Sequence, residues 1–246
     1  MKTIYQTTTE AIADIPSGAI VAIGGFFAAG VPRMLMRALK QMDISGLTIA
    51  CGSGPFLGAA EEGTALLEGD HVKHIIDSYA LPRSISKGKN NLLEQKVRAG
   101  QIELEVYPMG TLAEKYRAAG AGVAAFYIKT GVGTVVEKGV VTNMDDNVAS
   151  KEVKVINGET CVLEYALRPD FSLIHAYRAD TDGNLQYRKT ARNFNHVMAM
   201  AGRVTIAEVE EIVEPGELAP DCVHTSGIFV QRLVKVPKLD FTIGID

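Results

Sequence analysis

Short strand-like runs recur through the first half of the chain, and a turn and a helical pattern follow each of them. The runs cover residues 19–23, 47–51, 72–77 and 102–107. Largely apolar runs of this length are typical of strands that are buried on both faces of a parallel sheet. Helical spacing of apolar residues follows at 31–42, 61–68 and 112–119, and an earlier short helix is expected at 8–15, capped by Thr8 or Thr9. This alternation predicts an α/β fold, an open and mainly parallel sheet flanked by helices.

The second half of the chain is richer in glycine and in polar turns. Strands are expected at 160–164, 171–176 and 204–209, and residues 143–157 are expected to form an exposed hairpin region. Residues 180–184 are expected to form a turn, because they lack the terminal glutamate of a calcium-binding loop. No linker rich in proline or serine divides the sequence, so residues 1–246 are predicted to form a single domain.

Composition argues against nucleic-acid-binding, membrane-spanning and secreted proteins. The net charge of -4 gives no sign of nucleic-acid binding. No apolar run approaches the roughly 18 residues that span a bilayer, and the first 19 residues resemble neither a signal peptide nor a transit peptide. The three cysteines are odd in number and far apart, which favours a reducing compartment. We therefore expect a cytoplasmic protein that binds neither nucleic acid nor membrane.

The turns after the strands carry the candidate chemistry. Because the carboxyl ends of parallel strands meet at one edge of a sheet, we expect Gly24-Gly25, Gly52-Ser53, Ser78 and Met109-Gly110 to lie along that edge. The loop that ends at Gly30 precedes a helix, whose first N–H groups favour a phosphate or carboxylate. The alternative is that these glycines only permit close packing of a tight strand–helix turn.

Familiar catalytic motifs are missing. A nucleotide phosphate loop needs Lys and Ser or Thr where Val31 and Pro32 stand, and the adjacent Gly24-Gly25 do not match a dinucleotide fingerprint. No zinc-protease or serine-hydrolase motif occurs. An acidic cluster follows residue 207, and a solvated strand end explains it more simply than a paired-carboxylate site; its members are Glu208, Glu210, Glu211 and Glu214. The chain therefore reads as a ligand-binding part of an active site without its own nucleophile.

Basic residues gather between 81 and 100, namely Arg83, Lys87, Lys89, Lys96 and Arg98. They fit either a patch beside a phosphorylated ligand or a solvated helix with its loop, and we favour the second interpretation.

Six stretches, in order, resemble the α subunit of family I coenzyme A transferases, and most closely the succinyl-CoA:3-oxoacid type. The first contains Gly24-Gly25-Phe26 followed by Gly30 and Pro32. A later one reads Gly-Thr-Leu-Ala-Glu-Lys, where the family has Arg at the last position. The stretches cover residues 14–32, 110–115, 120–127, 130–139, 180–184 and 191–195.

The resemblance implies an enzyme that moves CoA between an acyl-CoA and a carboxylic acid by a ping-pong route. It implies that the nucleophile is a glutamate in a Ser-Glu-Asn-Gly motif of a separate β subunit. This sequence lacks that motif, so the chain is expected to supply no catalytic residue and to be inactive alone. CoA is then a substrate, no tightly bound cofactor or metal is expected, and α2β2 is the expected assembly. The CoA-associated segment would be Gly24, Gly25, Phe26, Phe27, Ala28, Ala29 and Gly30.

Two positions depart from the 3-oxoacid pattern. The family has two asparagines where this chain has Gly52-Ser53, and a glutamine where it has Met109. With Gly110, these residues form the expected substrate pocket. Because Met cannot donate a hydrogen bond, the change removes a contact of about 1–3 kcal/mol to a charged acceptor. A bulkier or less polar acyl group would follow, unless Met109 merely fills core space.

Other classes of function remain open on the sequence. A subunit that helps to hydrolyse or hydrate a CoA-linked substrate is the main alternative, and a partner without the glutamate would favour it. An NAD-dependent oxidoreductase is disfavoured by the glycine spacing. A non-catalytic binding or scaffold protein would not need a partner to bind thioesters.

Overall fold

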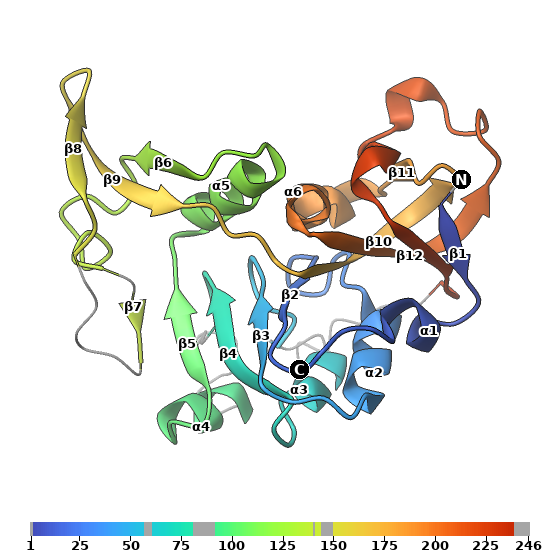
Figure 1. The fold of residues 1–246 in the computed structure, drawn as a ribbon, viewed down its shortest axis with the longest axis horizontal. Helices are drawn as coiled ribbons and strands as arrows, with labels where there is room; N and C mark the ends of the chain where they lie inside the picture. The colour runs from blue at the N-terminus through green and yellow to red at the C-terminus, as the bar shows by residue number, and fades with distance from the viewer. Residues whose placement is uncertain (1, 57–60, 81–91, 140, 144–149, 239–246) are drawn as a thin grey trace.

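The computed structural model describes residues 2–56, 61–80, 92–139, 141–143 and 150–238. Its main sheet is open and mostly parallel, which confirms the expected fold class (Figure 1). Only β5–β7 and β10–β11 pair antiparallel among its strands. In spatial order the strands are β1 (Thr3–Tyr5), β13 (Arg232–Lys235), β12 (Val204–Val213), β10 (Phe171–Asp180), β2 (Ile20–Ile23), β3 (Leu47–Ala50), β4 (Val72–Asp77), β5 (Glu103–Val106) and β7 (Val141–Thr142), with β11 (Leu185–Gln186) beside β10.

Helices cover both faces of this sheet. Four of them pack with one hydrophobic cluster: α1 (Thr8–Ile12), α2 (Arg33–Gln41), α3 (Glu61–Leu66) and α4 (Leu92–Arg98). Two others, α5 (Met109–Gly120) and α6 (Asn193–Ala201), pack with a second cluster. In Figure 1, α5 and α6 lie above the ends of β3, β4 and β5, and α2, α3 and α4 lie below. Three 3-10 turns complete the described helices: Lys189–Arg192, Pro220–Cys222 and Gly227–Phe229.

The alternation of side chains along the central strands explains the two clusters. Leu173 belongs to the cluster of α1 to α4, whereas its neighbour Ile174 belongs to the cluster of α5 and α6. Each strand is apolar on both faces because helices cover both. Small residues on the side of α5 and α6 leave room for these helices to approach; they are Ala22, Ala50, Ala176 and Ala207.

A separate antiparallel sheet forms in the second half of the chain, and the sequence did not predict it as such. Its order is β6 (Ala125–Ile128), β9 (Glu159–Tyr165) and β8 (Val153–Ile156). Asn157 and Gly158 join β8 to β9 with positive φ angles of 52° and 82°, as a two-residue hairpin requires. The predicted strand at 160–164 is the central strand of this sheet, which projects at the left of Figure 1.

Several predicted boundaries need correction. The first helix ends at Ile12, and its cap is Thr7, whose hydroxyl accepts from the Glu10 N–H while the Glu10 carboxylate accepts from the Thr7 N–H. The helix expected at 112–119 begins earlier, so Met109 and Gly110 belong to its first turn. The sequence missed α6, β1, β6 and β13 altogether.

The sheet has two topological switch points. At each one, the helices that follow two neighbouring strands pack on opposite faces of the sheet. At the first switch point, β2 leads to α2 on one face and its neighbour β10 leads to α6 on the other. At the second, β4 leads to α4 and its neighbour β5 leads to α5 on the opposite face. Open α/β sheets bind ligands at the carboxyl ends of strands at such points.

Candidate functional site

The glycine loop, residues 24–30, lies at the first switch point. The Gly24 N–H donates to the Leu173 carbonyl at 2.9 Å and so extends the ladder between β2 and β10. Phe26 and Ala29 exchange two backbone hydrogen bonds of 3.0 and 2.9 Å around a two-residue turn. Phe27, the first residue in that turn, has a φ of 51°. A bulky side chain in this left-handed region is strained, and such strain persists only where the surroundings hold it.

Two asparagines at the start of α6 hold this loop. Asn195 is fully buried, and its amide donates to the carbonyls of Gly30 and Ala191, both at 2.8 Å. Asn193 donates to the Ala29 carbonyl at 2.9 Å. The loop and the start of α6 are more than 160 residues apart in the sequence, yet each carries one of the stretches that resemble the transferase family.

Glycine is needed in the loop because the Asn195 amide occupies the space of two side chains. A Cβ on Gly24 would lie 2.0 Å from Asn195 Oδ1, and a Cβ on Gly30 would lie 2.7 Å from Asn195 Nδ2. Gly30 also has a φ of 71°, which disfavours other residues. Close packing therefore accounts for these two glycines, whether or not a ligand contacts the loop.

The start of α2 already has an anion, and the chain itself supplies it. Glu208 Oε2 accepts from the Leu35 N–H at 2.8 Å, and Glu208 Oε1 lies 3.0 Å from Nδ1 of His175. Glu208 is only 1% exposed, so its expected place at a solvated strand end is wrong. Because this carboxylate occupies the Leu35 N–H, that group cannot also bind a ligand phosphate.

Ser53 lies at the expected edge, next to the second switch point. Its own carbonyl accepts from the Phe27 N–H at 3.3 Å, and the preceding Gly52 carbonyl accepts from the Ser78 hydroxyl. Ser53 is 2% exposed, and its hydroxyl has no hydrogen-bond partner among the described residues. Gly52 packs against α6, where a Cβ would lie 2.4 Å from the Phe194 ring.

Met109 and Gly110 follow β5, which lies two strands away from β3 in the sheet. Met109 is 37% exposed, so the interpretation that it fills core space is wrong. A Cβ on Gly110 would meet no atom within 4 Å outside its own helix. The Tyr107 N–H donates to the Asp77 carbonyl at 3.1 Å and joins this end of β5 to the end of β4.

Buried polar groups collect beneath the second switch point. Asp77 is fully buried, and its Oδ1 accepts from the N–H groups of Ser78 and Tyr79 at 2.6 and 3.3 Å. Burial raises the pKa of Asp77, and these two N–H groups oppose that rise. The hydroxyls of Thr111 and Tyr116, on α5, are buried without hydrogen-bond partners among the described residues. Burial, followed by electrostatic interactions with Cys51 and Asp77, raises the pKa of Tyr116.

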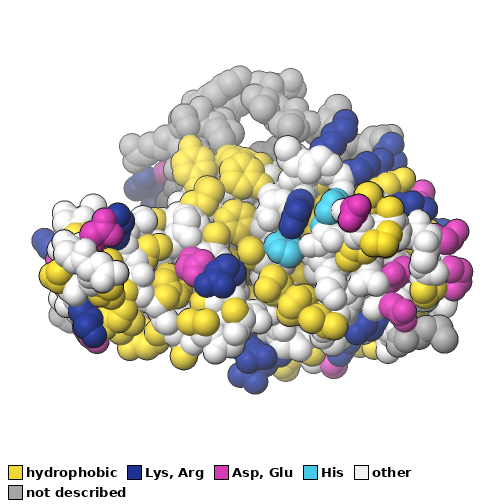
Figure 2. Space-filling view, turned by 90° about the horizontal axis from the view of Figure 1, so that it is seen from above, with side chains coloured by type: hydrophobic (Ala, Val, Ile, Leu, Met, Phe, Trp, Pro, Cys, Tyr) yellow, Lys and Arg dark blue, Asp and Glu magenta, His cyan; other side chains and the backbone are white. Residues whose placement is uncertain are grey.

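Aromatic side chains from two loops meet at this edge. The Phe27 ring lies edge-on to Phe26, with centroids 5.2 Å apart, and edge-on to Tyr79 at 6.0 Å. Tyr79 is 39% exposed. Figure 2 views the molecule from the side on which α5 and α6 lie in Figure 1, and it shows hydrophobic side chains across the centre of this face. The edge is therefore more apolar than a site built only for small charged acids.

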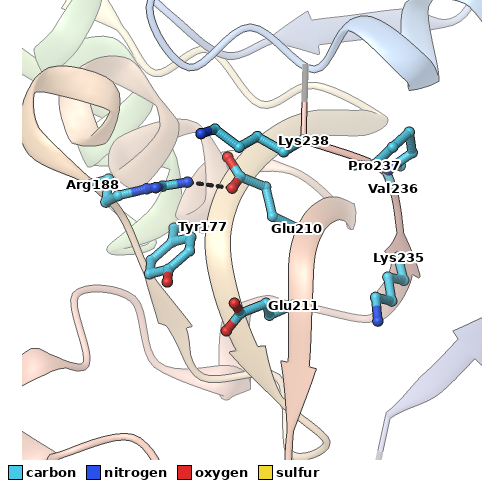
Figure 3. Close-up of a pocket in the computed structure, with 8 residues that line it drawn as sticks. All are labelled: Tyr177, Arg188, Glu210, Glu211, Lys235, Val236, Pro237 and Lys238. Carbon is cyan, nitrogen blue, oxygen red and sulfur yellow. Dashed lines mark hydrogen bonds and ion pairs between the residues drawn. The ribbon is translucent and has the colours of Figure 1, made fainter. Parts of the chain in front are cut away.

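A pocket of about 440 Å³ lies elsewhere, at the ends of β10, β12 and β13. Figure 3 shows Arg188 over the Tyr177 ring and paired with Glu210, while Lys235, Lys238 and Glu211 line the rest. None of the residues predicted for the site lines this pocket. Its positive and negative charges largely offset one another, so it does not select a ligand of one sign.

Comparison with known proteins is direct. The sequence profile of the family described as Coenzyme A transferase matches residues 5–236. The chain belongs to the coenzyme A transferase family. It is 44% identical over 234 residues to the A subunit of the succinyl-CoA:3-ketoacid coenzyme A transferase of Xanthomonas campestris, with 94% of this chain and 87% of that protein covered. A probable A subunit of the same type from Mycobacterium tuberculosis is 42% identical, with 97% and 95% covered.

A solved structure shares the fold. An acyl-CoA transferase from Escherichia coli O157:H7, solved as a thioester complex with CoA, superposes with a TM-score of 0.83 at 21% identity. All of this chain is covered, but it spans only 52% of that one. These comparisons confirm the transferase family, the A-type subunit and the fold class.

Among the residues that the structure describes, no group of three or more His, Cys, Asp or Glu side chains is arranged to hold a metal ion. None of the helices described is long and apolar enough to cross a bilayer. Arg83, Lys87 and Lys89 lie outside the described residues. Lys96 and Arg98 belong to α4, where they bind the Gly69 carbonyl and Glu94.

The sequence located the loops at this edge of the sheet but missed the polar groups behind them. Asn193 and Asn195 fall in a family-like stretch, but the sequence indicates no role for their side chains. The sequence gives only weak signals for the other three groups. Asp77 is a polar residue at the end of a strand, and Thr111 and Tyr116 are a polar and an aromatic residue within a helix. Only the fold buries these groups and brings Tyr116 close to Asp77.

Proposed function

We propose that this chain is the A-type member of a two-chain enzyme that transfers CoA between an acyl-CoA and a carboxylic acid of the 3-oxoacid class. The observation that carries the proposal is the identity of 42–44%, over nearly the whole chain, to proteins named as A subunits of succinyl-CoA:3-ketoacid coenzyme A transferases. The buried, unpartnered Ser53 hydroxyl at a switch point supports it, since a ligand oxygen there would satisfy this donor.

The partner is a β subunit that carries the catalytic glutamate. This chain spans 52% of the matching E. coli transferase chain, which fits an arrangement in which the other half is a separate polypeptide here. In a ping-pong route the glutamate carboxylate attacks the acyl-CoA thioester and ends as a CoA thioester, while the acyl group leaves as a carboxylic acid. An α2β2 assembly and a cytoplasmic location remain predictions.

Within this scheme the chain's own residues bind and orient. The loop from Gly24 to Gly30 lies along the CoA, held in shape by Asn193 and Asn195. Ser53 donates a hydrogen bond to an oxygen of the acyl group, and Gly110 leaves space beside it. Met109 and the Tyr79 ring present apolar surface there, which favours acyl groups less polar than succinyl.

The test is co-expression with the partner chain, incubation with succinyl-, acetoacetyl-, hexanoyl- or phenylacetyl-CoA, borohydride reduction and mass spectrometry of both chains. Borohydride reduces a glutamyl thioester to the alcohol, so a modified glutamate on the partner, with this chain unmodified, is the expected result. The matched control omits the acyl-CoA. CoA transfer to added acetoacetate or succinate is measured in parallel.

The second candidate is a component of a CoA-thioester hydrolase or hydratase on the same fold. The replacement of family amides by Gly52-Ser53 and Met109 favours it. Thioester binding by the pair without any covalent intermediate, and with release of free CoA or hydrated product, would establish this alternative and reject the transferase.

A further inference from the structure

Asp77 is a carboxylate in an unusual setting. It is fully buried at the end of β4, and no Lys or Arg side chain forms an ion pair with it among the described residues. Acidic side chains are seldom fully buried without a cation. Its carboxylate instead accepts two backbone N–H groups, those of Ser78 and Tyr79. These bonds fix the turn that follows the strand.

A chain of contacts runs from this turn to Ser53. Asp77 holds Ser78 through its backbone N–H, and the Ser78 hydroxyl donates to the Gly52 carbonyl. The peptide group between Gly52 and Ser53 is thereby fixed on one side, and the Phe27 N–H fixes the Ser53 carbonyl on the other at 3.3 Å. The position of the Ser53 hydroxyl therefore depends on the turn at Asp77.

Two further contacts join Asp77 to the loops of the site. Its Oδ2 lies against Gly54, where a Cβ would come within 2.6 Å of it. The Tyr79 ring, at the end of the same turn, contacts the Phe27 ring of the glycine loop with centroids 6.0 Å apart. The loops after β2, β3 and β4 thus share one anchor, and the Asp77 carbonyl binds β5 through the Tyr107 N–H.

We propose that Asp77 is the positioning residue of the acyl end of the site, because its buried carboxylate orients Ser53 through Ser78 and Gly52. The inference rests on the proposed function, in which Ser53 contacts the acyl group. Hydrogen bonds from N–H groups to a carboxylate are short and strong, and they hold a turn more firmly than neutral bonds. A displacement of about 1 Å at a reacting group lowers rates by about 100-fold, so an anchor of this kind acts on the chemical step.

The test is a double-mutant cycle on the complex with the partner chain, with the acyl-CoA that the wild type uses best among the four named above. Asp77→Ala and Ser78→Ala are expected to lower kcat by about 10- to 100-fold, and Ser53→Ala by about 10-fold. If Asp77 acts through Ser53, the double variant Asp77→Ala, Ser53→Ala falls to about the level of Asp77→Ala alone. Asp77→Asn keeps an acceptor oxygen without the charge, and it is expected to lose less activity than Asp77→Ala.

The matched control is Asp180→Ala. Asp180 is also a buried carboxylate at the end of a strand, and it holds its own turn through the N–H groups of Asp182 and Asn184. This variant is expected to lose stability while kcat per folded complex stays unchanged. Thermal unfolding and recovery of the complex are measured for every variant, so that loss of folded protein is separated from loss of rate.

Three results would overturn the inference. The first is an Asp77→Ala complex that is fully active. The second is a double variant whose loss of kcat equals the product of the losses for Asp77→Ala and Ser53→Ala. The third is a loss of stability in Asp77→Ala with unchanged kcat. A wild-type complex that transfers CoA from none of the four thioesters instead rejects the proposed function, and the inference with it.

Discussion

The two switch points of the main sheet differ in what fills them. At the first, between β10 and β2, the start of α6 enters the space, and the amides of Asn193 and Asn195 bind the carbonyls of the glycine loop. At the second, between β4 and β5, the hydroxyls of Thr111 and Tyr116, together with that of Ser53 on the adjacent strand, are buried without partners in the described structure.

The difference indicates that the two switch points have different roles. Polar groups that are satisfied within the chain stabilise a fixed shape, whereas buried polar groups without partners cost stability and are retained where a ligand or bound water satisfies them. The first switch point therefore shapes the loop along which CoA is proposed to lie. The second is proposed to offer hydrogen-bonding groups to the acyl end of the substrate.

The largest expected effect tests the packing at the first switch point. Gly24→Ala places a Cβ 2.0 Å from Asn195 Oδ1, and overpacking of this kind costs about 3 kcal/mol. We expect the free energy of unfolding, measured by urea titration, to fall by about that amount. Gly110→Ala is the control, because its Cβ meets open space in α5 and should raise stability by about 0.5–1 kcal/mol.

A second variant sharpens this result. Asn195→Ala removes the side chain that the new methyl group meets, so Gly24→Ala combined with Asn195→Ala should be less destabilised than the sum of the single changes. A Gly24→Ala protein as stable as the wild type would show that the loop is not locked by α6.

Ser53→Ala is expected to move stability and activity in opposite directions. The change removes a buried hydroxyl without a partner, so the free energy of unfolding should stay level or rise by up to about 1 kcal/mol. With its hydrogen bond to the acyl oxygen gone, kcat/KM should fall about 10-fold. A clear loss of stability would mean that the hydroxyl is already satisfied in the free protein, and the contrast between the switch points would fail.

Met109→Gln addresses acyl selectivity at the second switch point. Because Met109 is 37% exposed, the free energy of unfolding should change by less than about 0.5 kcal/mol. The new amide can bind a polar acyl group, so the ratio of kcat/KM for succinyl-CoA over hexanoyl-CoA should rise about 5-fold. Ile228→Gln, at a position 73% exposed and outside the site, should leave the ratio unchanged, and an unchanged ratio for Met109→Gln would remove this residue from the pocket.

The smallest expected effect is a pH dependence in α6. Burial, followed by the charges of Arg192 and His224, lowers the pKa of His196 from its ordinary value of 6.5, and its Nδ1 lies 3.0 Å from the Thr225 hydroxyl. The unfolded chain then binds this proton more readily than the folded one, so the contribution of His196 is present above about pH 6.5 and is lost as the pH falls below it. His196→Gln should flatten the stability profile between pH 7 and 5 in urea titrations, and an equal slope in both proteins would contradict the assignment.

Much of the sheet was predictable because its central strands are buried on both faces. The predicted strand at 72–77 has the observed boundaries, and the one at 19–23 agrees within one residue.

The small sheet escaped prediction because Val153, Val155 and Tyr165 expose apolar side chains on it, which removes the usual alternation of buried and exposed positions. Helix α6 begins with Asn-Phe-Asn, and Asn195 is buried there, so its pattern does not look amphipathic.

The sequence by itself determined the fold class, the family and the loops that line the carboxyl edge, since these depend on local periodicity and on motifs read along the chain. Only the tertiary structure decided that α2 to α4 and α5 to α6 cover opposite faces, and hence where the switch points fall. It also decided that Asn195 fills one of them, that Glu208 accepts from the Leu35 N–H in the first turn of α2, and that Asp77 anchors the other. These contacts join residues from separate strands and helices, and no local pattern specifies which polar groups meet across a core.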